Sequence, residues 1–180
     1  MRMLVKSLNI IKKQGDFSMD VFFIINCLCA IISIGGGLAT VINYNRSKRL
    51  TEYSHTSIAF IESQKIISTL TELLKLANSR TSKYGVNYEK RVAANGVLIR
   101  TSLIQIREKL SVSDLEEINN VLATESFNVD RYISSLISGD ALNEDRIFVI
   151  DDNFMACDEA FNTMQKLIKG KMSILASKLK

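Results

Sequence analysis

Proline and tryptophan are both absent from the 180 residues, and glycine occurs only eight times. Because proline costs about 3 kcal/mol in a helix interior and glycine about 1 kcal/mol, this scarcity favours long, uninterrupted helices. Tryptophan often marks the interfaces of a membrane, and here only Phe22, Phe23 and Tyr44 remain for that role around the apolar segment described below.

Motifs for catalysis and for cofactor or metal binding are also missing. No glycine-rich phosphate loop, G-x-S-x-G element or paired-cysteine motif occurs. His55 is the only histidine, and it cannot form a zinc site alone, since Cys157 occupies a core position by its helical phase. We therefore predict no catalytic residue, no cofactor, no metal site, no small-molecule substrate and no enzymatic activity.

One apolar segment dominates what is present. Residues 21–44 read VFFIINCLCAIISIGGGLATVINY and contain no charged residue, no histidine and no proline. A helix of this length rises about 36 Å, which suffices to cross a hydrocarbon core of roughly 30 Å. We therefore predict a single transmembrane helix over Val21–Tyr44, and the competing interpretation is a buried core helix. Cys27 and Cys29 are interpreted as membrane-filling side chains.

The segment before this helix, residues 1–20, is a basic tail. Leu4, Leu8 and Ile11 share one stripe, which is typical of a short interfacial helix ending at Gly15, and a frayed tail is the alternative. The apolar run exceeds the usual length of a signal-peptide core, and no clear cleavage site follows it. We therefore expect a retained signal-anchor and a single-pass protein of the plasma or inner membrane.

Orientation depends on the basic residues beside the apolar segment. Four lie upstream, and Arg46, Lys48 and Arg49 lie immediately downstream, so both flanks favour the cytoplasm. We expect the soluble part to be cytoplasmic, because its basic cluster is tighter and its one thiol is free. A re-entrant hairpin turning at Gly35–Gly37 is the alternative that places both flanks on one side.

Small residues recur along the apolar segment at intervals of four. Cys29, Ser33 and Gly37 share one face, on which two helix backbones can approach closely. We predict this transmembrane packing face as a contact between copies of the chain, which makes a homo-oligomer an expected partner.

Residues 45–180 show helical periodicity throughout and predict a soluble domain. We expect an antiparallel bundle of long helices with two short capping helices, the first long helix being continuous with the transmembrane helix. The expected helices cover Thr51–Ala77, Asn87–Leu110, a short one capped by Ser113, a short one over 128–138, and a last one from Ile147. The first of them has an apolar stripe of Phe60, Ile67, Leu70, Leu74 and Ala77, which Ile66 and Leu73 widen. The polar run Asn78–Gly85 is expected to be a loop.

The last helix carries the strongest pattern. Seven apolar residues alternate steps of three and four, as in a coiled coil, and we call them the C-terminal seam: Ile147, Ile150, Phe154, Cys157, Phe161, Met164 and Ile168. A seam of this period packs against another helix at a shallow angle. The sequence favours packing within the chain and leaves packing against another copy open.

Acidic residues gather around the start of the same helix. Residues 140–159 contain seven acids against Arg146 alone. The spacing lacks the loop glycine of an EF-hand, so we interpret the face as a docking surface for a basic protein rather than a metal site, formed by Asp151, Asp152, Asp158 and Glu159. The lysine-rich tail from Lys166 onward lacks arginine and aromatic residues, and we expect no nucleic-acid binding.

Two classes of function remain. The leading one is a membrane-anchored interaction or signalling module, whose bundle meets a protein partner or copies of itself. The alternative is a membrane-acting effector of the toxin or anti-phage type, whose oligomerised transmembrane helices disturb the lipid bilayer. Expressing residues 1–49 alone separates them, because membrane depolarisation is expected only for the effector.

Overall fold

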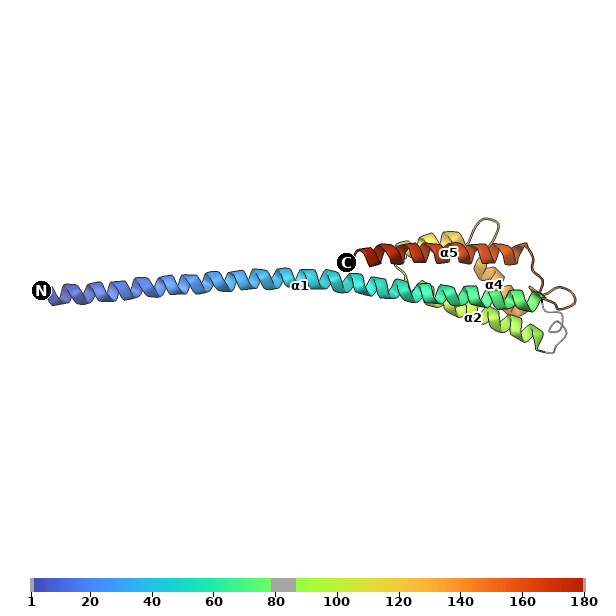
Figure 1. The fold of residues 1–180 in the computed structure, drawn as a ribbon, viewed down its shortest axis with the longest axis horizontal. Coiled ribbons are helices and arrows are strands. Elements are labelled where there is room, and N and C mark those ends of the chain that lie inside the picture. The colour runs from blue at the N-terminus through green and yellow to red at the C-terminus, as the bar shows by residue number, and fades with distance from the viewer. Residues whose placement is uncertain (1, 79–86, 180) are drawn as a thin grey trace. The chain divides into compact units, whose positions relative to one another are not determined.

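The computed structural model describes the backbone of residues 2–78 and 87–179, and the side chains of residues 26–78 and 87–179. These ranges contain five α-helices and no β-strand (Figure 1). The helices are α1 (Arg2–Asn78), α2 (Tyr88–Lys109), α3 (Val112–Leu122), α4 (Val129–Ser138) and α5 (Asp152–Ser177). The predicted all-α fold class is confirmed for this part of the chain.

Helix α1 continues through the glycines that the sequence analysis treated as possible breaks. It passes Gly15 without ending and passes Gly35–Gly37 without turning, so the expected helix end and the re-entrant hairpin are both wrong. Glycine lowers helix stability by only about 1 kcal/mol per residue, which neighbouring helix formers offset. The expected loop over Asn78–Gly85 lies, beyond Asn78, outside the described residues.

The chain divides into two compact units, Met1–Lys48 (the N-terminal unit) and Arg49–Lys180 (the helical bundle). The N-terminal unit belongs to the one described helix that is long and apolar enough to cross a membrane. From residue 26 to its end, every side chain of this unit is exposed within the chain. The apolar stretch is therefore not a core helix of this fold.

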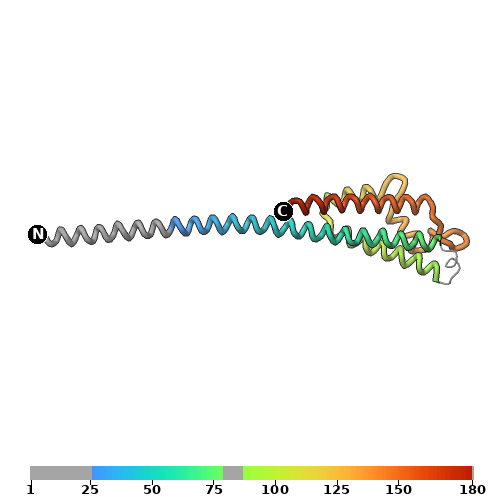
Figure 2. Tube along the Cα trace, viewed as in Figure 1, coloured from blue at the N-terminus to red at the C-terminus, as the bar shows by residue number. Residues whose placement is uncertain are grey.

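Within the helical bundle, the part of α1 from Arg49 onward runs between α5 and α2 in the view of Figures 1 and 2, and hydrogen bonds join it to α2 and to the end of α5. The Arg49 guanidinium donates to the Lys178 carbonyl at 3.2 Å, so α5 returns antiparallel to the start of the bundle. The predicted stripe of α1 is buried at Ile66, Leu70, Leu73 and Ala77, whereas Phe60 and Ile67 are only half-buried and Leu74 is 38 % exposed. The buried line alternates steps of four and three and includes two small residues that were not predicted, Ala59 and Ser63, with Thr56, Glu62 and Leu76 also buried.

The C-terminal seam begins later than the pattern predicts. Ile147 and Ile150 precede α5, which starts only at Asp152, because the Asp151 carboxylate accepts the Phe154 N–H at 2.8 Å and caps the helix there. Ile147 and Ile150 are half-buried beside the helix rather than on it. The remaining seam side chains are buried within the chain: Phe154, Cys157, Phe161, Met164 and Ile168.

The short helices pack along the long ones. Helix α3 packs against α5, and α4 packs against α2 and α5. Ser111, rather than the predicted Ser113, caps α3 by accepting the Asp114 N–H at 3.3 Å. The spacing of Ser111 and Asp114 also has the form of a capping box, so both serines carried the signal. Helix α4 ends at Gly139, whose φ of 87° suits a residue without a side chain.

A charged residue is buried between α1 and α2. The Glu62 carboxylate accepts hydrogen bonds from the Ser102 hydroxyl at 2.8 Å and from the Lys65 ammonium at 2.5 Å. Burial alone would raise the pKa of Glu62. The two hydrogen bonds and the Lys65 charge together lower the pKa by more than burial raises it, so the net pKa lies below its usual value. Glu62 therefore stays ionised at neutral pH and joins the two helices.

Helices α2 and α4 lie close together at Gly96. A Cβ atom at this position would lie 2.9 Å from Ile137 Cγ1, a distance that real Cβ contacts essentially never show, and a tight 3.1 Å from Leu136 Cβ. Gly170, in the middle of α5, has no atom within 4 Å of the same point. Gly96 and Gly170 therefore form a matched pair, in which the same glycine-to-alanine substitution meets a crowded site and an open one.

We expect Gly96→Ala and Gly170→Ala to change stability in opposite directions. Alanine at 170 removes the helix penalty of glycine and raises the free energy of unfolding by about 1 kcal/mol. Alanine at 96 must displace the backbone of α4, which costs about 1–3 kcal/mol and outweighs the same gain. Chemical denaturation of both variants followed by circular dichroism checks the signs, and equal shifts would contradict the close crossing.

Candidate functional site

The predicted docking surface lies on the first turns of α5. Asp151, Asp152 and Glu159 are exposed and Asp158 is half-buried. Asp151 is used as the helix cap, and Asp158 accepts a hydrogen bond from the Asn162 amide at 3.1 Å. Among the described residues none of the four forms an ion pair. Their negative charge is therefore available to a partner.

An apolar side chain lies among these acids. Met155 is 57 % exposed and follows Asp151 and Asp152 by four and three residues. It precedes Asp158 and Glu159 by three and four residues, so helical spacing makes Asp152, Asp158 and Glu159 its neighbours, while Asp151 caps the helix. Methionine adapts its shape to different contact surfaces. Met155 was not predicted as part of this surface, although the sequence places it three residues from Asp152 and Asp158 and four from Asp151 and Glu159.

The connection before α5 adds to this acidic region. Its only base, Arg146, is held by the Glu89 carboxylate of α2 through two hydrogen bonds of 3.0 and 2.9 Å. The same pairing raises the pKa of Arg146 and lowers the pKa of Glu89. Because Arg146 is bound by Glu89, it does not neutralise the seven acids of residues 140–159.

The predicted transmembrane packing face lies on the N-terminal unit. Cys29, Ser33 and Gly37 are exposed, and a Cβ built on Gly37 meets no atom within 4 Å. The Ser33 and Thr40 hydroxyls donate to the carbonyls four residues earlier, each at 2.8 Å. Because these hydroxyls are satisfied inside the helix, neither requires water or a partner.

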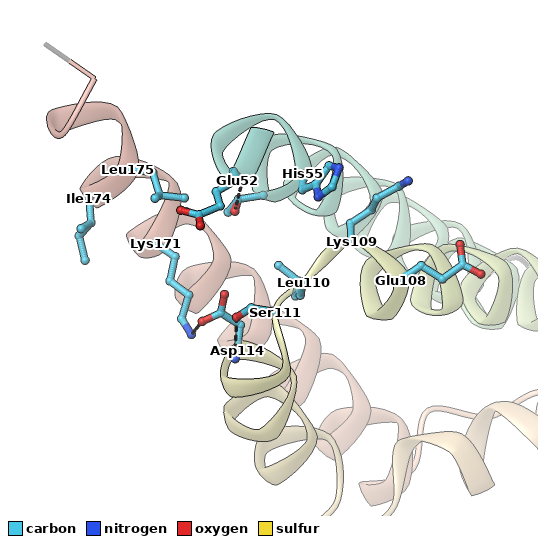
Figure 3. A pocket seen from close by; sticks show the side chains of 11 residues that line it. Glu52, His55, Glu108, Lys109, Leu110, Ser111, Asp114, Lys171, Ile174 and Leu175 are labelled. Atoms are coloured by element: carbon cyan, nitrogen blue, oxygen red, sulfur yellow. Dashed lines mark hydrogen bonds and ion pairs between the residues drawn. The ribbon is translucent and has the colours of Figure 1, made fainter. Parts of the chain in front are cut away.

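An open cavity of about 450 Å³ lies at the surface of the helical bundle, where α1, the α2–α3 junction and α5 meet (Figure 3). Glu52 and His55 of its lining are exposed to solvent. Its walls include Glu52 and Thr56 of α1, Leu110 at the junction, and Lys171 and Leu175 of α5. Thr56 and Leu110 are buried, at 5 % and 8 % exposure. The cavity therefore combines an apolar wall with charged groups.

The charges around this cavity are unequally paired. Lys171 binds both the Asp114 and the Glu117 carboxylates, at 2.5 and 2.6 Å. Burial lowers the pKa of Lys171, but these two pairings raise it more, so its net pKa is raised. For Glu52 no ion pair is found among the described residues. Figure 3 shows its side chain reaching from α1 towards Leu175 on α5.

The two remaining candidate residues, Cys157 and His55, differ in their exposure to solvent. Cys157 is fully buried, and burial raises the pKa of its thiol well above the ordinary value, so the thiol is unreactive in the folded chain. His55 is exposed and lines the cavity beside Lys109 (Figure 3). The sequence shows no neighbour for either residue, and only the fold places His55 at a cavity.

Comparison with known protein families, with curated proteins and with solved structures finds no match to this chain. Function is therefore inferred from the residues and their arrangement alone.

Proposed function

We propose that this chain is a membrane-anchored helical interaction module. In this proposal the segment Val21–Tyr44 spans the bilayer once, as a retained signal-anchor, and the helical bundle meets a protein partner or other copies of the chain. In this proposal the chain holds a binding surface at a membrane, and it has neither an enzymatic activity nor a cofactor.

One observation carries the membrane part of the proposal. Large apolar side chains on α1 are between 53 % and 71 % exposed within the chain: Leu28, Ile31, Ile32, Ile34, Leu38, Val41, Ile42 and Tyr44. Each fully buried side chain of this type stabilises a protein by about 1.5–3 kcal/mol relative to its exposed state. A contiguous apolar surface of this kind marks a membrane or protein interaction site, and the length of the segment favours a membrane.

The orientation in the proposal places the helical bundle in the cytoplasm. Arg46, Lys48 and Arg49 follow the apolar segment directly, and basic residues at this position favour the cytoplasmic side. A cytoplasmic bundle is consistent with the single unpaired thiol of Cys157. The packing face of Cys29, Ser33 and Gly37 is proposed as the contact between copies within the membrane.

The acidic surface around Met155 is the proposed contact for a protein partner. Its exposed carboxylates favour a basic partner, and Met155 offers that partner an apolar contact. A photo-reactive residue in place of Met155 is expected to give a specific cross-linked adduct in cells. Reversing two charges, with Asp152→Lys and Glu159→Lys, is expected to lower the adduct yield about tenfold, because like charges oppose the encounter.

The matched control reverses two exposed acids elsewhere in the bundle, Glu116→Lys and Glu125→Lys. This control changes the net charge equally and is expected to leave the adduct yield unchanged. An equal loss in both double variants, or no loss in either, would reject the acidic surface as the partner contact.

A further inference from the structure

The fold brings the C-terminal end of α5 to the first residue of the helical bundle. Arg49 is that first residue, and its guanidinium donates to the carbonyl of Lys178, the C-cap of α5, at 3.2 Å. Two segments that lie 129 residues apart in the sequence therefore form one end of the bundle. We call it the proximal end and define it by Arg49 and Leu50 of α1 with Ile174 and Lys178 of α5.

The proximal end exposes large apolar side chains beside basic ones. Ile174 is 56 % exposed and Leu50 is 50 % exposed. Ile174 precedes Lys178 by four residues, and Lys178 keeps helical backbone angles, so the two side chains share one face of α5. A face of this kind is typical of helices at a lipid surface, because the apolar group enters the headgroup boundary while the lysine ammonium stays in the polar layer.

The chain around the proximal end is basic. Residues 45–50 contain three bases and no acid, and residues 160–180 contain five lysines and no acid. Of the lysines in that second range whose side chains the structure describes, Lys171 alone forms ion pairs. Glu52, the first acid after the apolar segment, follows all three bases of the first range. Basic residues in this arrangement attract the anionic headgroups of a nearby membrane.

The chain also limits how far the proximal end can lie from the bilayer. Arg49 follows Tyr44, the last residue of the apolar segment, by five residues. Five residues rise about 7.5 Å in a helix and reach at most about 18 Å when fully extended. If Val21–Tyr44 spans the hydrocarbon core, Arg49 lies within that distance of its edge, together with the end of α5 that it binds. A tether this short gives the proximal end a high effective concentration of lipid headgroups.

We propose that the proximal end of the helical bundle lies on an anionic lipid surface, with Ile174 between the headgroups and the Lys178 ammonium against their negative charge. The inference rests on the proposed function, because it requires Val21–Tyr44 to span the bilayer. Met155 lies nineteen residues before Ile174 on α5, about 29 Å away along the helix. The lipid contact therefore leaves the acidic surface around Met155 accessible to a protein partner.

The absence of tryptophan makes the test direct, because a single substituted tryptophan reports on its own surroundings. Three variants of the full chain are reconstituted in nanodiscs of phosphatidylcholine and phosphatidylglycerol: Ile174→Trp at the proximal end, Met155→Trp at the other end of α5, and Ile32→Trp in the apolar segment. Ile174 and Met155 are matched in exposure, at 56 % and 57 %. Lipids brominated near the headgroup quench an interfacial tryptophan, and lipids brominated near the chain end quench one inside the hydrocarbon core.

We expect the interfacial bromolipid to quench Ile174→Trp and not Met155→Trp, and the deep bromolipid to quench Ile32→Trp. In phosphatidylcholine alone, the ratio of lipid-bound to free proximal ends is expected to fall at least about tenfold, because two basic residues lose their anionic partners. Quenching of Ile32→Trp alone, equal quenching of Ile174→Trp and Met155→Trp, or equal quenching of Ile174→Trp in both lipids would overturn the lipid contact and leave the anchor standing. Absence of quenching in both Ile32→Trp and Ile174→Trp would overturn the membrane span itself.

Lys178→Glu, made in the Ile174→Trp chain, tests the charge separately. It leaves intact the backbone carbonyl that Arg49 binds. In phosphatidylglycerol nanodiscs it is expected to lower the ratio of bound to free proximal ends at least about fivefold, the contribution of one basic residue near an anionic surface. Lys166→Glu, which is also exposed on α5 and changes the net charge equally, is the matched control and is expected to leave the quenching unchanged. An equal effect of the two charge variants would also overturn the proposal.

Discussion

Substituting aspartate for both Ile32 and Ile34 is expected to release the protein from the membrane. The two side chains are 71 % and 65 % exposed on α1 and lie near the middle of the apolar segment. An aspartate at the centre of a transmembrane helix costs about 2.5–3.5 kcal/mol on the insertion scale, so two of them cost about 6 kcal/mol. Alkaline extraction of membranes, followed by detection of the protein in the soluble fraction, measures the effect.

The matched control is Ile32→Val with Ile34→Val, which keeps the segment apolar and is expected to stay in the membrane fraction. Helical-bundle integrity is checked in both variants by protection of the Cys157 thiol. If the aspartate variant remained in the membrane pellet with a folded bundle, the segment would not be held by the hydrocarbon core.

Phe161→Ala is expected to produce the largest loss of bundle stability, about 3–5 kcal/mol. Phe161 is fully buried at the centre of the C-terminal seam, and its removal leaves a cavity that the surrounding helices cannot fill. Lys166→Ala, on the exposed side of α5, is the control and is expected to change stability little.

Alkylation of Cys157 provides the measurement for this variant. The thiol is fully buried, so it reacts only when the bundle opens, and mass spectrometry of its peptide separates it from Cys27 and Cys29. The denaturant concentration at which Cys157 becomes reactive is expected to fall strongly for Phe161→Ala. An unchanged midpoint would show that this part of α5 does not stabilise the fold.

Periodicity predicted the helices well where a cap coincided with it. The expected 128–138 helix agrees with α4 because Asn128 caps its start and Gly139, with positive φ, ends it. The expected Asn87–Leu110 helix also agrees with α2, although the Asn87 side chain makes no capping hydrogen bond, so there the apolar periodicity alone located the helix. At α4 the local signal and the packing preference identified the same boundary.

Register and boundaries were predicted less well where two patterns competed. On α1 both Phe60 with Ile67 and Ala59 with Ser63 follow a helical spacing, and hydropathy favoured the larger side chains. The fold buries Ala59 and Ser63 fully and leaves Phe60 and Ile67 half-buried against the edge of the core. On α5 the apolar spacing extends back to Ile147, but the Asp151 cap begins the helix five residues later.

The cavity was not predictable from any single segment. Glu52 and Lys171 lie far apart in the sequence, and each alone resembles a charged residue on a helix surface. Only the fold places both at one cavity. The acidic surface of α5 was predictable because its members lie within nine residues of one another.

The central claim is that the chain crosses the membrane once with its bundle in the cytoplasm. The most direct measurement labels single cysteines with a membrane-impermeant maleimide in intact and in permeabilised cells, after Cys27 and Cys29 are changed to serine. We expect S7C to label in intact cells and S177C to label only after permeabilisation. In intact cells, labelling of both positions or of neither would contradict a single span, and labelling of S177C alone would contradict a cytoplasmic bundle.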